Sequence, residues 1–203
     1  MKISSKTAYM WRVKIYKCFS DYQESTILSG DVWLDECFIN IPRSQMIVVN
    51  GRHLRGISNN KIAICVGVDS QHQVFARVVG KGHLSSQQIL NAYGPHIKHG
   101  SHIIHDGFRG HDELIQRLNL RETFTKSTSK ESKLLLQPVN NFISQIKRNL
   151  VLHVGGKREY VQDYLDWICF KHSIKSFKID DKVELVFDYC SRSGVTFLQK
   201  DRY

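Results

Sequence analysis

The first third of the chain alternates apolar and polar positions in a way that predicts strands. Residues 29–41, "SGDVWLDECFINI", alternate and are rich in Val, Trp, Phe and Ile, as in a strand with two different faces. Residues 62–70, "IAICVGVDS", are almost continuously apolar, which favours a strand buried on both sides. Residues 73–82, "QVFARVVGKG", are its expected hairpin partner, and the basic segment 49–61, "VNGRHLRGISNNK", is an expected hairpin loop.

The pattern then changes to alternating helices and short strands. A capped amphipathic segment at 85–97 precedes the short apolar stretch "SHIIHDG", and a helix at 110–120 precedes "RETFT". Residues 126–137 read as a loop, and further helices are expected at about 138–150 and at 157–173. An antiparallel start followed by β–α alternation predicts an α/β protein with the ribonuclease-H-like fold, a mixed sheet flanked by helices.

The two ends of the chain fall outside this pattern. Residues 4–19 read as a helix, and their start, "SSKTAYMW", resembles the second helix of a helix-turn-helix unit. We therefore expect residues 1–25 to be a helix-turn-helix remnant and residues 28–175 to form the main domain. Residues 176–203 form a tail without an assigned role, in which "KVELVFDY" is the one expected strand.

Net charge and composition limit the kinds of binding partner and the cellular location that we expect. The 203 residues carry 29 Lys and Arg against 19 Asp and Glu, a net charge of +10, which favours a polyanionic partner, with DNA first. No apolar run is long enough to span a membrane. The basic N-terminus has no apolar signal segment, and the five cysteines are scattered without a C-x-x-C pair. We therefore expect a cytoplasmic protein with reduced thiols.

Two aspartates stand out as candidate metal ligands. Asp35 lies inside an otherwise apolar strand, where a carboxylate is costly to bury unless it is paired or binds a cation. Asp106 ends a short strand, and Gly107 lets the backbone turn away directly after it. In the expected fold these strands are neighbours. The pair is therefore a candidate site for two Mg²⁺ or Mn²⁺ ions, which suits phosphoryl transfer.

A helix that starts near Pro138 offers a third group. Asn140 lies at its beginning, and Lys147 follows two helical turns later on the same face. An amide oxygen can bind a hard cation, and the lysine can hold a DNA phosphate. From the residues alone, Asn140 can equally be an N-cap or early-turn residue, with Lys147 and Arg148 as solvated charges.

Several segments together resemble the ISXO-type insertion-sequence transposases, a branch of the DDE transposase superfamily. The matching segments, in chain order, are "SSKTAYMWRVKI", "VWLDECFI", "GRHLRGISNNK", "HDGFRGHDEL", "VNNFISQIKRNL" and "YVQDYLDWICFKH". The resemblance implies a ribonuclease-H-like catalytic domain that uses divalent metal to cleave DNA and transfer strands. It implies Asp35 and Asp106 as the first two catalytic residues, Asn140 in place of the third acid, and Lys147 as the family's lysine.

The sequence also departs from that family. Its members usually begin with a zinc ribbon and a full helix-turn-helix, so we expect an N-terminally truncated form. A His-x-Asn segment commonly precedes the third ligand, whereas here "LLQPV" occupies that place.

Three functional hypotheses follow from the sequence. The first is a transposase that acts on its element's ends and on target DNA as a homo-oligomer. The second is a non-catalytic DNA-binding remnant, and the third is a ribonuclease-H-like nuclease. In each, the expected DNA-binding residues are basic side chains of the loop and the helix: Arg52, Arg55, Lys61, Lys147 and Arg148.

Overall fold

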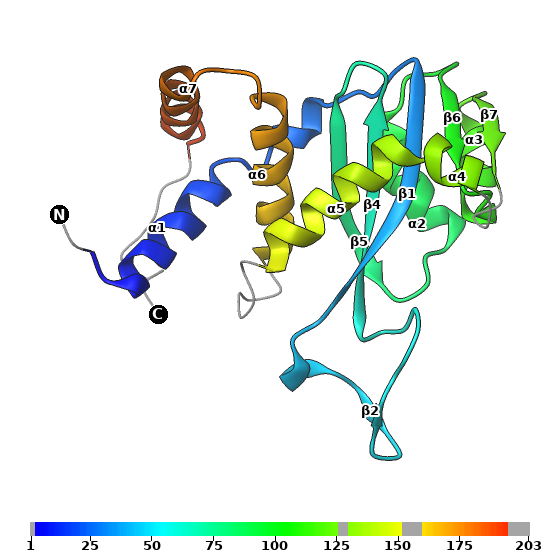
Figure 1. Ribbon diagram of the computed structural model, residues 1–203, viewed down its shortest axis with the longest axis horizontal. Coiled ribbons are helices and arrows are strands. Elements are labelled where there is room, and N and C mark those ends of the chain that lie inside the picture. Colours follow the sequence, from blue (N-terminus) through cyan, green and yellow to red (C-terminus); the bar gives the residue numbers. More distant parts are fainter. Residues whose placement is uncertain (1–2, 126–129, 152–159, 195–203) are drawn as a thin grey trace.

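A five-stranded mixed sheet forms the centre of the protein (Figure 1). The computed structural model describes residues 3–125, 130–151 and 160–194, with the backbone alone for 130–132. The strand order is β5-β4-β1-β6-β7. The strands β1, β4 and β5 are antiparallel, whereas β6 and β7 run parallel to β1. Their bounds are β1 Asp31–Asn40, β4 Lys61–Asp69, β5 Val74–Lys81, β6 His102–His105 and β7 Arg121–Phe124.

Helices cover both faces of this sheet. On one face, α5 (Gln137–Val151) and α6 (Val161–Ser173) share an apolar core with β1, β4 and β5. On the other face, α2 (Ser86–Tyr93) and α3 (Asp112–Arg117) close a second core. The interior strand β4 is therefore buried along nearly its whole length, as its unbroken apolar sequence predicts. This arrangement confirms the predicted ribonuclease-H-like fold.

The N-terminal helix packs beside the last two helices, away from the sheet (Figure 1). The helix α1 (Ser5–Lys17) begins where expected, since the Ser4 side chain accepts a hydrogen bond from the backbone N–H of Thr7. Phe19, just after α1, stacks on Tyr189 of α7 (Ile179–Arg192). That residues 1–25 belong to a helix-turn-helix unit stays a prediction. Among the helices in the described ranges, none has the length and apolar character needed to cross a membrane.

Two sequence predictions were wrong in this part of the chain. Residues 182–189 lie within α7 and do not form a strand. The apolar residues of this segment lie on two sides of a helix. Leu185 and Val186 pack against the cluster that contains Phe19 and Phe170, whereas Val183 and Phe187 are exposed. The predicted loop at 126–137 contains the helix α4 (Lys130–Leu135); residues 126–129 lie outside the described part of the chain.

A small hairpin projects from the sheet between β1 and β4 (Figure 1). It consists of β2 (Val48–Val49) and β3 (Arg52–His53), which pair as an antiparallel ribbon and confirm the predicted hairpin. The described residues also form four short 3₁₀ helices: η1 Tyr22–Ser25, η2 Arg43–Gln45, η3 Gly94–His96 and η4 Arg109–His111.

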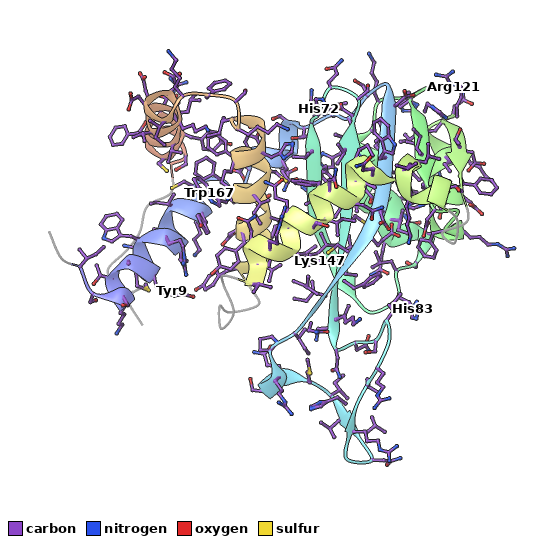
Figure 2. All side chains as sticks on the ribbon, in the orientation of Figure 1. Tyr9, His72, His83, Arg121, Lys147 and Trp167 are labelled. Carbon is purple, nitrogen blue, oxygen red and sulfur yellow. The ribbon has the colours of Figure 1, made fainter. Side chains whose placement is uncertain are left out.

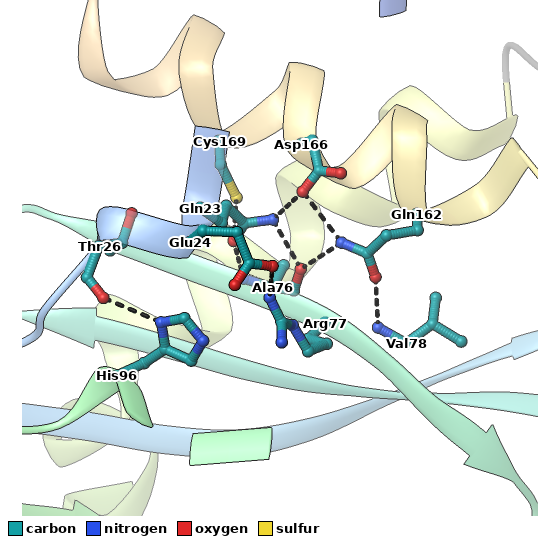
Figure 3. Close-up of polar contacts among 10 residues, drawn as sticks. All are labelled: Gln23, Glu24, Thr26, Ala76, Arg77, Val78, His96, Gln162, Asp166 and Cys169. Carbon is teal, nitrogen blue, oxygen red and sulfur yellow. Dashed lines mark hydrogen bonds and ion pairs between the residues drawn. The ribbon is translucent and has the colours of Figure 1, made fainter. Parts of the chain in front are cut away.

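Side-chain amides satisfy the free backbone edge of β5 (Figure 3). The Gln23 amide accepts a hydrogen bond from the Ala76 N–H at 2.7 Å and donates to the Ala76 carbonyl at 2.9 Å. Two residues along the strand, the Gln162 amide oxygen accepts from the Val78 N–H at 2.8 Å. At Ala76 and Val78 the edge is thereby covered by η1 and α6 and is not open to another strand.

The same glutamines surround a buried carboxyl group on α6. Asp166 is 1% exposed, and its Oδ1 accepts hydrogen bonds from Gln23 and from Gln162, the latter at 3.0 Å (Figure 3). Its Oδ2 has no hydrogen-bond partner among the described residues. Burial is the main cause that raises the pKa of Asp166 to about 7, against the hydrogen bonds from the two glutamines, which lower it.

We predict that Asp166→Asn removes part of the pH dependence of folding stability. The folded state holds the Asp166 proton up to about pH 7, whereas the unfolded chain releases it near pH 4. The free energy of unfolding therefore falls as the pH rises through this window. We expect the variant to gain on the order of 2–4 kcal/mol relative to wild type between pH 4.5 and pH 8. Urea denaturation at both pH values measures this change.

Asp181→Asn on α7 is the matched control, because Asp181 is exposed. Its difference from wild type should be the same at both pH values. If the Asp166→Asn difference were equally independent of pH, the buried carboxyl group would not be protonated in the folded state.

Candidate metal and DNA site

Asp35 and Asp106 lie on the same face of two neighbouring strands. β1 and β6 pair in parallel, with Trp33 beside Ile104, and each aspartate comes two residues after one of these partners. Because side chains alternate along a strand, both carboxyl groups lie on the sheet face that α5 covers. The structure therefore brings together the two residues that the sequence singled out, although their role as metal ligands stays a prediction.

The charge around Asp35 fits a cation site. Burial raises the pKa of Asp35 to about 6, the hydrogen bond from the Glu36 N–H lowers it, and the nearby charges of Glu36 and Asp106 raise it further. Two carboxylates that disfavour each other's ionisation are stabilised when a divalent cation lies between them. Oxygen donors of this kind suit Mg²⁺ and Mn²⁺.

The turn after Asp106 has the geometry that the sequence predicts. Gly107 has a φ of +82°, a conformation that costs glycine little and other residues more. The Asp106 carboxylate accepts a hydrogen bond from the Phe108 N–H at 3.0 Å, which holds it at the end of β6.

The helix α5 presents Asn140 and Lys147 beside its buried stripe. Val139, Ile143 and Ile146 pack onto the sheet, and both polar residues are exposed at the border of this stripe. At about 100° per residue they lie about 20° apart around the helix axis. The Asn140 N–H donates to the Leu136 carbonyl at 3.0 Å, so Asn140 lies inside the first turn and is not the N-cap.

Lys147 lies close to the strand that carries Asp35 (Figure 2). Burial raises the pKa of the Cys37 thiol to about 11, while the positive charge of Lys147 lowers it and the charge of Asp35 raises it. Cys37 is two residues from Asp35 on the same face of β1. The charges of Lys147 and Asp35 thus both shift the pKa of the Cys37 thiol, which lies near each of them.

The other predicted DNA-binding residues are spread over a wider surface. Arg52 on β3 and Arg55 just after it are exposed on the projecting hairpin. Lys61 begins β4 at the base of this hairpin, opposite Asn40 of β1, and Arg148 is exposed on α5. The hairpin that carries Arg52 and Arg55 projects away from the sheet (Figure 1). Lys61 and Arg148 lie on β4 and α5 of the domain itself.

A polar chain of four side chains, which sequence reasoning missed, lies behind the aspartates: Glu36, His111, His105 and Glu122. His111 Nε2 lies 3.0 Å from a Glu36 carboxylate oxygen, and the Nδ1 atoms of His111 and His105 are 3.1 Å apart. His105 Nε2 lies 3.3 Å from a carboxylate oxygen of Glu122. The four residues come from β1, η4, β6 and β7, and no short motif links them. The one feature of the sequence that could have indicated these contacts is Glu36. It follows Asp35 on the strand, so its side chain must point to the opposite sheet face and needs a partner there.

Hydrogen bonds fix the donors and acceptors among these four residues. A carboxylate oxygen accepts, so each Nε2 that contacts one is a donor, and the contact between the two Nδ1 atoms needs one donor and one acceptor. Burial and the neighbouring His111 lower the pKa of His105, against its hydrogen bond to Glu122, which raises it. The His111–Glu36 contact joins two side chains that are 0% and 6% exposed and is therefore shielded from solvent.

Within the described ranges, no three histidine, cysteine or carboxylate side chains gather closely enough to hold a metal ion. The buried chain is thus no metal centre itself. The candidate site on the α5 face has two carboxylates, and Asn140 is the residue that would add a neutral oxygen.

The mixed sheet with helices on both faces defines the class of ribonuclease-H-like domains. The family model of the ISXO2-like transposase domain matches residues 27–172, and the chain belongs to this family. No curated protein matches the sequence significantly.

Solved structures of integrases and transposases are similar at low sequence identity. A chain of the simian T-cell lymphotropic virus intasome is 11% identical with a TM-score of 0.47, over 76% of this chain and 51% of that one. The BIV integrase catalytic core is 14% identical with a TM-score of 0.44, over 80% and 98%. The Mos1 mariner transposase catalytic domain is 15% identical with a TM-score of 0.34, over 98% of both chains.

We predict that Mn²⁺ stabilises the protein through Asp35. A metal ion bound only by the folded state raises the free energy of unfolding by about 2.7 kcal/mol at 100 times its dissociation constant. Asp35→Asn should abolish this increase, because it removes one of two anionic ligands. Urea denaturation with and without Mn²⁺ measures the effect.

Asp31→Asn is the control on the same face of β1, where Asp31 contacts His102 at the far end of the strand. This variant should respond to Mn²⁺ as the wild type does. Equal stabilisation of Asp35→Asn would place the metal elsewhere.

Proposed function

We propose that this protein is a transposase that cleaves DNA and transfers strands with the help of divalent metal ions. The observation that carries the proposal is the placement of Asp35 and Asp106 on one face of β1 and β6, beneath α5. Membership of the ISXO2-like family supports the same conclusion. The likeness to solved structures supports the fold alone.

Asp35, Asp106 and Asn140 are the residues that would hold the metal ions. The two carboxylates supply negative charge, and the Asn140 amide supplies a neutral oxygen from the first turn of α5. Mg²⁺ or Mn²⁺ held by these residues would supply the Lewis acid that phosphoryl transfer needs at the attacking hydroxyl group and at the leaving oxygen. The apolar packing of α5 on β1 and β4 keeps Asn140 and the strands in a fixed relation.

Basic side chains would hold the DNA beside this site. The Lys147 charge acts on Cys37, two residues from Asp35 on β1. Lys147 would bind a phosphate next to the cleaved bond, with Arg148 one residue further on α5. Arg52, Arg55 and Lys61 would contact the backbone further away, along the hairpin and its base. Such contacts make the affinity for DNA strongly dependent on salt.

We extend the proposal to the whole assembly. Residues 1–25 would contribute to binding the element ends, and residues 28–175 would carry the chemistry. Because two element ends must be joined to one target, at least two copies would act together.

DNA binding without catalysis is the second candidate. The observation that favours it is Asn140 itself, because an amide in place of the third acid leaves the site with one negative charge fewer. The basic residues of the hairpin and of α5 would retain their function in such a protein.

The test measures Mg²⁺- or Mn²⁺-dependent cleavage and strand transfer on DNA with the inverted repeats of the protein's own element. We expect activity in the wild type, and at least a ~100-fold loss in Asp35→Ala and in Asp106→Ala. Lys147→Ala should weaken DNA binding and reduce the slope of its salt dependence by about one.

Asp31→Asn serves again as the control and should keep full activity. Cleavage unchanged in both aspartate variants would contradict the assignment. Salt-dependent DNA binding without cleavage in any variant would establish the second candidate. Cleavage that ignores the terminal repeats and yields no strand transfer would indicate a nuclease instead.

A further inference from the structure

The backbone ladder between β1 and β6 ends before it reaches the aspartates. It joins Asp31–Trp33 to His102–Ile104, whereas Asp35 and Asp106 come two residues later. On either side the sheet continues, since β1 pairs with β4 as far as Asn40. β6 pairs with β7 as far as Phe124, and the Thr125 N–H donates to the His105 carbonyl at 3.2 Å. Within the described part of the chain, β1 and β6 thus have no backbone pairing with each other at the level of the two carboxylates.

At this level the polar chain joins β1 to β6, on the sheet face that α2 and α3 cover. Glu36 directly follows Asp35, and His105 directly precedes Asp106. His111 connects the two, with 3.0 Å to Glu36 and 3.1 Å to His105. Neighbouring residues on a strand share the backbone although their side chains point to opposite faces. A displacement of Glu36 or His105 therefore also moves the aspartate beside it.

Two further contacts fix this connection in place. The Tyr93 hydroxyl lies 3.1 Å from the Asp35 carbonyl oxygen and 3.0 Å from that of Val66, and it can donate to either. Gly110 allows η4 to approach closely, because a Cβ at this position would lie 2.5 Å from Ile89 and 2.6 Å from the Phe108 ring. The close approach places His111 where its side chain is fully buried.

We propose that Glu36, His111 and His105 are positioning residues, which set the separation of Asp35 and Asp106 by joining β1 to β6 where their backbone pairing has ended. The proposal rests on the proposed function, because the separation matters only if the two aspartates bind metal. A purely structural network would contribute to folding stability without affecting metal affinity. Residues that orient metal ligands typically change metal affinity by 10- to 100-fold when they are replaced.

The test compares Mn²⁺ affinity, measured by calorimetry, with cleavage in three variants and a control. Glu36→Gln keeps an oxygen that accepts from His111, so we expect the dissociation constant to rise less than about threefold. The double variant Glu36→Leu with His111→Phe removes both partners together and leaves no unpaired charge between them. We expect its dissociation constant for Mn²⁺ to rise at least about tenfold. Its cleavage rate should fall and recover in part at high Mn²⁺.

His111→Gln is the third variant and decides the result if the double variant does not fold. A glutamine amide reaches Glu36 or His105 but does not bridge them as the imidazole does. We expect about a fivefold loss of Mn²⁺ affinity or more. Glu184→Gln, on the exposed side of α7, is the control for charge and should match the wild type.

The outcomes separate this proposal from the proposed function. If the wild type binds Mn²⁺ and cleaves DNA while folded His111→Gln and the double variant bind Mn²⁺ equally well, the positioning role is wrong and the function stands. If the wild type neither binds Mn²⁺ nor cleaves DNA, both proposals fail. Circular dichroism and urea denaturation establish which variants are folded.

Discussion

Parallel pairing of β1 with β6 brings together two segments that lie far apart in the sequence, and the rest of the site depends on this contact. The register, with Trp33 beside Ile104, places Asp35 and Asp106 at the same level and on the same face. A shift of one residue would turn one carboxylate to the opposite side of the sheet. The apolar packing of α5 and α2 on the two faces fixes this register.

At Asp35 and Glu36, the two faces of β1 carry carboxyl groups with different surroundings. Asp35 lies on the face covered by α5, where burial and the charge of Asp106 raise its pKa. Glu36 lies on the opposite face and is paired with His111. The Glu36 carboxylate therefore has a hydrogen-bond partner within the protein, whereas the two aspartate carboxylates would be stabilised by a cation bound between them. This contrast distinguishes a structural carboxylate from a candidate ligand one residue away.

Local patterns predicted most of the fold but not its long-range contacts. The alternation in 29–41 and the apolar run of β4 predicted the sheet, and Gly107 predicted the turn after Asp106. The segment 182–189 misled, because Val183, Leu185 and Phe187 alternate as in a strand while the tertiary packing selects a helix. The contact between His105 and His111 depends on where η4 packs against α2, which no local pattern records.

We propose that Asp35 and Asp106 form one metal site with Asn140. Anomalous diffraction from crystals soaked in Mn²⁺ is the decisive measurement, because the scattering locates manganese independently of any activity. We predict anomalous density within coordination distance of carboxylate oxygens of both aspartates, on the face covered by α5. Manganese bound elsewhere, with none at this pair, would contradict the account.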